Sequence, residues 1–384
     1  MRTRNPRRLG AAVLAGAVAA LACAPVAQAA AARTSSLQGE VNAIKATGNV
    51  AVVAEMTGPR GHSFATAGLA DAATGAPAQS YDSFRIGSAT KTFVATVLLQ
   101  LVGERRVSLD DTVEHWLPGV VSGNGNDGSK ITIRELLQHT SGIYNYLADL
   151  PAVASTAGYL ANRFTTYTPA QLVALAMQHA PDFAPGAEWE YSNTNYILAG
   201  MIINRVTGHS WQEEVNARII RPLGLRHTIT PGTDPSIPGP HLHGYSNFGS
   251  GPTIDVTLFN PTAADAAGEI SSTTADLTTF YSALMRGRLL APAQLAAMET
   301  TVSAPIWPGA RYGLGLMWVP LSCGGGYFGH AGGVPGYTTR DGVTPDGRRV
   351  AVVERTGDGD APASGSEQTT EALIDAQLCQ SAPR

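Results

Sequence analysis

The chain has 384 residues, of which 44% are hydrophobic and 15% are charged, and its formal net charge is −4. This composition is typical of a soluble globular protein and excludes a disordered or fibrous chain. The length is too great for one small core and fits one large domain or two interlocked domains. The slightly acidic charge gives no electrostatic basis for binding nucleic acid or an anionic membrane surface.

The first 29 residues have the pattern of a secretory signal peptide. Residues 1–10 carry four arginines and no acid, residues 11–22 are apolar, and Ala27-Gln28-Ala29 is a small-x-small cleavage site. The apolar run is too short to span a bilayer comfortably, so we expect a secreted protein without a membrane span. Acylation of Cys23 is the alternative. Cleavage removes four of the 26 basic residues and leaves 22 against 30 acidic ones, a net charge of −8.

The remaining chain has strand-like ends and a helical middle. Alternating apolar residues predict two antiparallel strands at residues 50–56 and 63–69, with a turn at 58–61. Helical spacing then follows from residue 88 to about 103–106. The helix-rich middle includes segments at 133–138, 169–179 and 196–206 and an irregular stretch at 230–255. Strands are predicted at 313–319, 327–331 and 349–354, and a helix at 366–379.

This order predicts one domain interrupted by another. Residues 33–107 and 271–384 would share a sheet, and residues 108–270 would form a helical domain beside it. A cleft between two such units is where a ligand site is expected.

Ser88-Ala89-Thr90-Lys91 opens the strongest predicted helix. At positions i and i+3 the hydroxyl and the amine lie on one helix face, and the helix start offers free N–H groups to an oxyanion. A neutral Lys91 amine can accept the hydroxyl proton, whereas a charged one can lower the pKa of a neighbouring phenol. Only three lysines occur in the chain, and arginine cannot replace a base that must lose its proton. The alternative is an exposed lysine beside an N-capping serine.

Two further motifs follow in the chain. Tyr191-Ser192-Asn193 combines a phenol that can exchange protons with an amide that can hold a substrate amide, although an N-cap turn would also explain it. In Gly329-His330-Ala331-Gly332-Gly333, small residues let a substrate backbone approach a strand. His330 would offer a proton-dependent positive charge there, and the alternative is a structural histidine.

Cys323 and Cys379 remain after signal cleavage, and an even number of cysteines in an oxidising compartment predicts a disulfide between them. Other catalytic signatures are missing: the sequence has no G-x-S-x-G elbow, no H-E-x-x-H pair and no phosphate-binding loop. His241 and His243 lack partners at metal-ligand spacing. We therefore expect neither a metal nor a cofactor.

In their order and spacing, the three motifs resemble those of the penicillin-binding serine hydrolases. That family includes secreted actinomycete D-alanyl-D-alanine carboxypeptidases, class C β-lactamases and related esterases, and S-x-x-K is one of its catalytic motifs. Residues 136–143 (LLQHTSGI), 221–225 (RPLGL) and 312–316 (YGLGL) resemble further elements of the family. The resemblance implies an α/β fold of the β-lactamase/transpeptidase type, an antiparallel sheet flanked by helices with an inserted all-helical domain.

The resemblance also implies a role for each motif residue. Ser88 would be acylated, and Lys91 and Tyr191 would exchange protons with it, with the identity of the general base left open. Peptides or esters would be the substrates, and β-lactams would be covalent ligands.

On the binding side, the resemblance implies that Asn193 holds the acyl-side amide and that His330 takes the place of the lysine in K-T-G enzymes. The N–H groups of Ser88 and Gly333 would form the oxyanion hole.

Two departures from the carboxypeptidase pattern concern the substrate. Secreted actinomycete carboxypeptidases read H-T-G-T where this chain has H-A-G-G, and they carry an arginine where it has Met317. In that group these side chains hold the free carboxylate of the peptide. We expect a D-alanyl-D-alanine carboxypeptidase-like or other D-amino-acid-directed peptidase, with cell-wall stem peptides among its substrates. The alternatives are a carboxylic-ester hydrolase, a β-lactamase, or a penicillin-binding module that does not turn over.

Overall fold

A computed structural model describes residues 36–59, 61–357 and 365–380. The predicted signal peptide and Cys23 lie outside these residues. No helix within them is long and apolar enough to cross a membrane.

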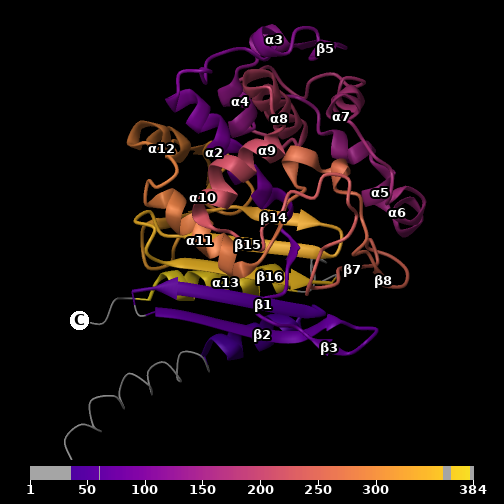
Figure 1. The fold of residues 1–384 in the computed structure, drawn as a ribbon, viewed down its shortest axis with the longest axis vertical. Coiled ribbons are helices and arrows are strands. Elements are labelled where there is room, and N and C mark those ends of the chain that lie inside the picture. Colours follow the sequence, from indigo (N-terminus) through magenta and orange to yellow (C-terminus); the bar gives the residue numbers. More distant parts are fainter. Residues whose placement is uncertain (1–35, 60, 358–364, 381–384) are drawn as a thin grey trace, which may run out of the picture.

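The centre of the fold is a ten-stranded antiparallel sheet (Figure 1). Its main path runs β10-β11-β12-β13-β15-β16-β1-β2-β3, and β14 pairs with β15 beside that path. The strands are β1 (Ala51–Gly58), β2 (Gly61–Asp71), β3 (Ala76–Pro77), β10 (Val302–Ser303), β11 (Arg311–Tyr312), β12 (Met317–Pro320), β13 (Gly326–Gly329), β14 (Ala331–Val334), β15 (Tyr337–Val343) and β16 (Val350–Thr356).

The two ends of the chain share this sheet, as the sequence predicts. β1 lies between β2 and β16, with Ala51 opposite Thr356 and Thr57 opposite Val350. Side chains of a strand alternate between its two faces, and β1 does so: Val52 belongs to one core cluster and Val53 to another. The domain boundaries at residues 107 and 270 stay a prediction.

Helices cover both faces of the sheet. On one face, residues 36–46 and α13 (Ser366–Leu378) pack through Leu37, Ile44 and Leu373. The other face carries α11 (Thr274–Met285) and the larger core, in which the rings of Phe93 and Phe280 stack 3.7 Å apart. Beyond this layer lie the helices of the middle segment (Figure 1), among them α4 (Ile133–Gln138), α5 (Pro151–Ala154), α6 (Thr156–Asn162), α7 (Pro169–Ala176), α8 (Thr194–Thr207) and α9 (Trp211–Val215).

Two predicted strands are wrong in their extent. In the predicted strand 313–319, residues 313–316 form the hairpin turn between β11 and β12, in which Gly313 N–H donates to the Leu316 carbonyl at 2.7 Å, and the strand begins only at Met317. Gly315 adopts a φ of +72°, which favours glycine, so the alternating apolar residues turn instead of extending. The predicted strand 327–331 is interrupted at His330, because β13 ends at Gly329 and β14 begins at Ala331.

The predicted disulfide is confirmed. Cys323 and Cys379 are bonded with their Cα atoms 5.7 Å apart, and the bond links the β12–β13 turn to the end of α13. The two cysteines are 56 positions apart, and closing a loop of this size contributes on the order of 2–4 kcal/mol to stability.

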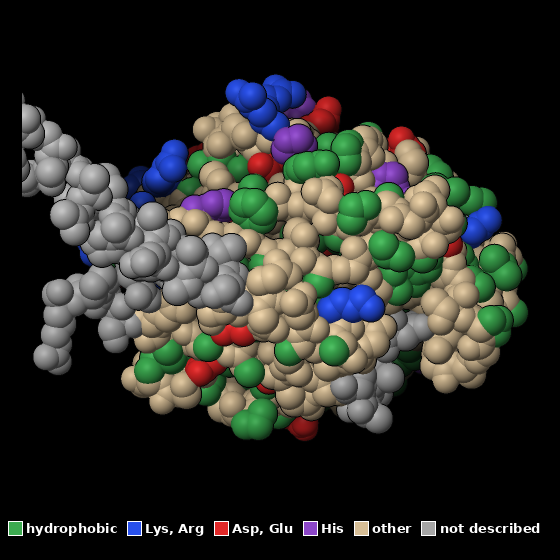
Figure 2. All heavy atoms as spheres, turned by 90° about the horizontal axis from the view of Figure 1, so that it is seen from below, with side chains coloured by type: hydrophobic (Ala, Val, Ile, Leu, Met, Phe, Trp, Pro, Cys, Tyr) green, Lys and Arg blue, Asp and Glu red, His purple; other side chains and the backbone are tan. Residues whose placement is uncertain are grey.

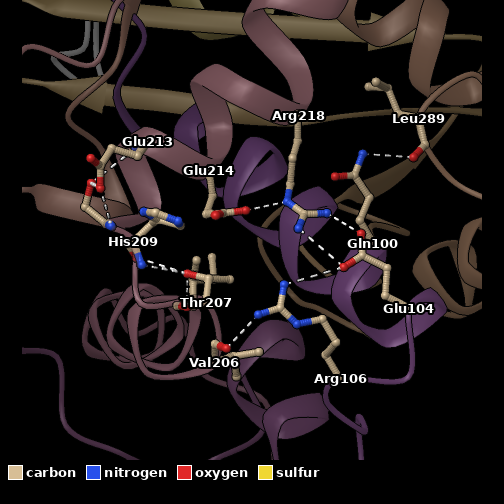
Figure 3. Close-up of polar contacts among 12 residues, drawn as sticks. Gln100, Glu104, Arg106, Val206, Thr207, His209, Glu213, Glu214, Arg218 and Leu289 are labelled. Atoms are coloured by element: carbon tan, nitrogen blue, oxygen red, sulfur yellow. Dashed lines mark hydrogen bonds and ion pairs between the residues drawn. The ribbon is translucent and has the colours of Figure 1, made fainter.

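An ion-pair network fixes the far end of α2 (Thr90–Gly103) against the helical region (Figure 3). Arg218, on a π-helical turn, binds both Glu214 and Glu104, and Glu104 follows the last residue of α2. Arg106 donates to the Val206 carbonyl at 2.7 Å and so ties the same end to α8.

Figure 2 shows how charged side chains are distributed over one face of the molecule. On the face seen from the side of β2 and β3, acidic and basic side chains of the described residues are scattered among polar and apolar ones (Figure 2). They form no continuous basic surface on the part of that face that is visible.

Candidate active site

The S-x-x-K motif spans a 3-10 turn and the start of α2. Ser88 lies in the turn Gly87–Ala89, and Lys91 lies in the first turn of the helix. Gly87 has a φ of +50°, and a Cβ atom there would come within 2.6 Å of the Gly333 nitrogen. The turn and β14 can approach each other closely because Gly87 and Gly333, which have no side chains, lie where they meet.

Lys91 is fully buried and joins three partners. Its Nζ atom lies 3.0 Å from Ser88 Oγ, 2.7 Å from Asn193 Oδ1 and 2.8 Å from the Ala267 carbonyl. None of these partners carries a negative charge, and burial holds the pKa of Lys91 well below its ordinary value. The site therefore favours a neutral amine beside the serine hydroxyl.

Tyr191 packs against the same amine. Lys91 Nζ lies 4.7 Å from the centre of the Tyr191 ring. Burial raises the pKa of Tyr191, and the proximity of Ser88 opposes that shift only in part. The phenol oxygen is buried and has no hydrogen-bond partner of good geometry among the described residues. The phenol is therefore protonated and lies close to the serine.

Two residues that the sequence analysis did not single out hold the Tyr191-Ser192-Asn193 loop. Asn145 Oδ1 accepts from the backbone N–H and the side-chain amide of Asn193 at 3.2 and 3.3 Å, which turns Asn193 Oδ1 toward Lys91. His139 Nδ1 accepts from the Ser192 N–H at 3.3 Å. The only feature of the sequence that could have pointed to Asn145 is that asparagine favours the N-cap position, which it occupies before the short helix at residues 146–149. His139 lies in the LLQHTSGI element but has no assigned role there.

His330 does not supply the positive charge expected from the sequence. It is buried, and burial together with Lys91 lowers its pKa to about 3, so the imidazole is neutral at pH 7. Its Nε2 lies 2.8 Å from the Tyr312 hydroxyl and its Nδ1 faces the Ala331 carbonyl. Since a carbonyl only accepts, Nδ1 carries the proton and Nε2 accepts from Tyr312. The ring therefore joins Tyr312 to β14.

The two glycines of β14 differ in how much space surrounds them. A Cβ atom at Gly332 would lie 1.9 Å from the Ile86 carbonyl oxygen, whereas one at Gly333 would have nothing within 4 Å. Gly332 thus allows the strand to pack onto the serine turn, and Gly333 is exposed toward the cavity.

This contrast gives a matched pair of variants. Gly332→Ala is expected to destabilise the protein by about 3 kcal/mol, because backbone must move to relieve the clash. Gly333→Ala is expected to change the free energy of unfolding by less than about 1 kcal/mol. Thermal and urea unfolding of both variants tests this, and equal stabilities would contradict the packing described.

A cavity of about 610 Å³ opens at Ser88. Of the predicted site residues, Ser88, Asn193 and Gly333 line it, whereas Lys91 and His330 are buried and Tyr191 is partly buried beside them. Its walls come from the short 3-10 helix at 146–149, α5, residues 246–249, residues 259–268 and the end of β14. Among the described residues, no group of three or more histidine, cysteine or acidic side chains is arranged to hold a metal.

Comparison with known proteins agrees with this geometry. The family model described as Beta-lactamase matches residues 42–375. The structure of a D-stereospecific amidohydrolase from Streptomyces sp. is 46% identical, has a TM-score of 0.83 and covers 91% of this chain and 99% of its own. A D-amino acid amidase from Ochrobactrum anthropi SV3, solved with L-phenylalanine amide, is 28% identical, with a TM-score of 0.77 and coverage of 89% and 96%.

Curated relatives are matched over a smaller share of their length. PbpX of Bacillus subtilis (strain 168) is 28% identical over 273 residues, which are 71% of this chain and 61% of that protein. Protein flp of Staphylococcus aureus (strain MW2) is 32% identical over 190 residues, 50% of this chain and 36% of flp. The chain therefore spans less than two thirds of either relative.

Proposed function

The chain belongs to the beta-lactamase family of serine hydrolases and has the β-lactamase/transpeptidase fold, and from this premise we propose that it hydrolyses amide bonds on the carbonyl side of D-amino acid residues. Ser88 Oγ attacks the carbonyl carbon, the C–N bond breaks and the amine leaves with a proton. Water then cleaves the ester on Ser88, releases the acid and restores the hydroxyl. The similarity of this chain to a D-stereospecific amidohydrolase and to a D-amino acid amidase supports the D-configuration of the substrate residue.

In this proposal Lys91 is the proton acceptor and Tyr191 the proton carrier. The amine lies 3.0 Å from Ser88 Oγ, and burial lowers the pKa of Lys91 while it raises that of Tyr191. Both shifts favour a neutral amine that can accept the serine proton and a phenol that can pass a proton to the leaving amine. Asn193 would hold the acyl-side amide, and the N–H groups of Ser88 and Gly333 would stabilise the oxyanion.

Two arginines close in sequence to the His330 motif, Arg311 and Arg340, already have protein partners, and this supports an amidase over a carboxypeptidase. A free carboxylate on the leaving group needs a charge-assisted partner. Arg311 donates to the Thr301 hydroxyl and carbonyl at 2.7 and 2.9 Å, and Arg340 is paired with Glu367. Met317, at the position of the family's arginine, is buried beside Tyr312. Among the described residues, no charged side chain lines the cavity at Ser88, and this observation carries the proposal.

The test compares leaving groups on one acyl donor. We expect kcat/KM for an amidated D-alanine leaving group to equal or exceed that for the free acid, and D-residue amides to be cleaved at least 100-fold faster than L-residue amides. A preference of tenfold or more for the free acid, which corresponds to about 1.4 kcal/mol, would contradict the amidase and support a carboxypeptidase. Equal rates for the D- and L-amides would refute the stereochemical part.

Export and β-lactam binding are parts of the same proposal. The signal-like residues 1–29 and the Cys323–Cys379 bond both support an oxidising compartment outside the cytoplasm. The family membership supports acylation of Ser88 by penicillin, and cell-wall stem peptides are candidate substrates. A penicillin adduct that lasts for hours would favour a peptidase or a penicillin-binding module that does not turn over, rapid loss a β-lactamase, and no adduct an ester hydrolase.

A further inference from the structure

His139 ends α4 in a backbone conformation that side chains rarely adopt. Its φ and ψ are +62° and +37°, in the left-handed region, and its side chain is fully buried. A residue other than glycine stays in this region only where surrounding contacts hold it, and such residues cluster at functional sites. The contacts of His139 therefore indicate its role.

His139 binds three successive residues of the loop that carries Tyr191. Its carbonyl accepts from the Glu190 N–H at 3.1 Å, and its Nδ1 accepts from the Ser192 N–H at 3.3 Å. Between these two bonds, the imidazole packs on the Tyr191 ring, with the ring centres 4.2 Å apart and the planes tilted by 35°. One residue thus holds both the ring of Tyr191 and the backbone on either side of it.

The partners of the imidazole fix which nitrogen carries the proton. Nδ1 of His139 faces the Ser192 N–H and, at 3.1 Å, the side-chain amide nitrogen of Asn195. That amide is oriented by Ser141, whose hydroxyl donates to Asn195 Oδ1 at 2.6 Å. Both partners of Nδ1 are donors, so the neutral ring carries its proton on Nε2. Burial holds the pKa of His139 well below its ordinary value, which keeps the ring neutral.

The Tyr191 phenol depends on these contacts for its place. Among the described residues its hydroxyl has no hydrogen-bond partner of good geometry, so the ring and the backbone decide where the oxygen lies. Proton transfer needs a donor and an acceptor about 2.6–3.2 Å apart, and a misplacement of about 1 Å costs on the order of 100-fold in rate. A residue that holds this loop therefore controls the step in which the phenol takes part.

We propose that His139 is a positioning residue, which holds the Tyr191 phenol where it can give its proton to the leaving amine. The inference rests on the proposed function, in which Tyr191 carries that proton, and it adds the residue that places the carrier. Its means are the bond to the Ser192 N–H and the contact with the Tyr191 ring.

The role of the proton distinguishes amide from ester substrates. When the C–N bond breaks, the nitrogen takes the electron pair and needs the phenol proton to leave as an amine. The phenolate of Tyr191 then regains a proton from Lys91, which holds the one it took from Ser88. A p-nitrophenyl ester breaks a C–O bond instead, and p-nitrophenolate leaves as an anion without a proton. Loss of His139 should therefore slow amide cleavage much more than ester cleavage.

The experiment compares two substrates with one acyl group, D-phenylalanine p-nitroanilide and the D-phenylalanine p-nitrophenyl ester. The anilide-to-ester ratio of kcat/KM does not depend on the fraction of a preparation that is folded. We expect this ratio to fall by about tenfold or more in His139→Ala. Asparagine tolerates the left-handed conformation and offers Oδ1 in place of Nδ1, so His139→Asn should recover about threefold or more of that loss. An unchanged ratio in His139→Ala, or an equal fall in His139→Asn, would overturn the inference.

Two further variants separate the inference from the proposed function. His209→Ala, at an exposed position after α8, should keep the ratio of the wild type. Tyr191→Phe should lower the ratio by about tenfold or more, and adding His139→Ala to it should change the ratio by less than about twofold, because both residues act through one phenol. An additive fall in the double variant would overturn the role of His139. An unchanged ratio in Tyr191→Phe would instead refute the proposed function.

The tautomer gives a test that needs no enzyme activity. The titratable side chains packed on the His139 ring are Tyr191, Tyr196 and Tyr312. In NMR spectra of protein labelled with 15N-histidine, the signals that His139→Asn removes should belong to a neutral ring with its proton on Nε2. Because burial, Lys91 and His330 all lower the pKa of His139, these signals should not shift between pH 5 and pH 8. Titration in that range, or a proton on Nδ1, would contradict the contacts on which the inference rests.

Discussion

Ser88→Ala is expected to lower kcat/KM for amide substrates by about four to six powers of ten while the protein stays folded. A nucleophile and its base act as a unit, so removing the nucleophile leaves only substrate binding and oxyanion stabilisation. The side chain that is lost is one hydroxyl at the edge of a cavity, and its Oγ lies 3.0 Å from Lys91 Nζ. The fold should therefore tolerate the change.

The measurement is steady-state kinetics together with the intact mass of acid-quenched reactions. The wild type should show a mass increase equal to the acyl group, and Ser88→Ala should show none. Ser303→Ala, at an exposed position of β10, is the control for loss of a hydroxyl and should behave as the wild type. Activity of Ser88→Ala within tenfold of the wild type would rule out Ser88 as the nucleophile.

Lys91→Arg should be nearly as inactive as Lys91→Ala, with both about 1,000-fold below the wild type or lower. General-base catalysis contributes roughly 10²–10⁴-fold, and arginine keeps the charge but cannot release its proton. The guanidinium is also bulkier, and Lys91 has no exposed surface into which it could extend. An arginine variant within tenfold of the wild type would show that Lys91 contributes charge alone.

The pH dependence gives an independent measurement on Lys91. Because burial lowers the pKa of this amine, it is neutral at pH values where a free lysine is charged. The value of kcat/KM should fall as the pH decreases through the folded pKa, since protonation removes the proton acceptor. Between that pKa and the ordinary 10.5, the unfolded chain binds a proton that the folded chain does not. Stability should therefore rise with pH in this window, and Lys91→Met should abolish that slope.

The parts of this protein that depend on neighbours in the chain could be predicted from sequence. Ser88 and Lys91 are three positions apart, and a helical turn places them on one face whatever surrounds it. The alternation in residues 50–56 predicts a strand with two different faces, as β1 has. The pairing of Cys323 with Cys379 follows from there being no other cysteine beyond the predicted signal sequence.

The properties that depend on distant residues were decided by the tertiary structure. The sequence analysis expected His330 to offer a proton-dependent positive charge, but burial together with Lys91 lowers its pKa to about 3, so it is neutral at pH 7. Asn145 lies 48 positions from Asn193, and no spacing rule connects them. Arg311 and Arg340 lie near the third motif in the chain, and only the folded structure shows that they bind Thr301 and Glu367.

The physical reason is that charge state and substrate preference are set by desolvation and by partners that folding brings together. The sequence lists the groups that can titrate, but their pKa values depend on how much water and which charges surround them. The cavity at Ser88 is lined by described residues from segments between residues 88 and 357, so it exists only once those segments pack. Sequence alone therefore predicted Ser88 and Lys91 as a reacting pair, and the tertiary structure decided the burial and the partners of that pair.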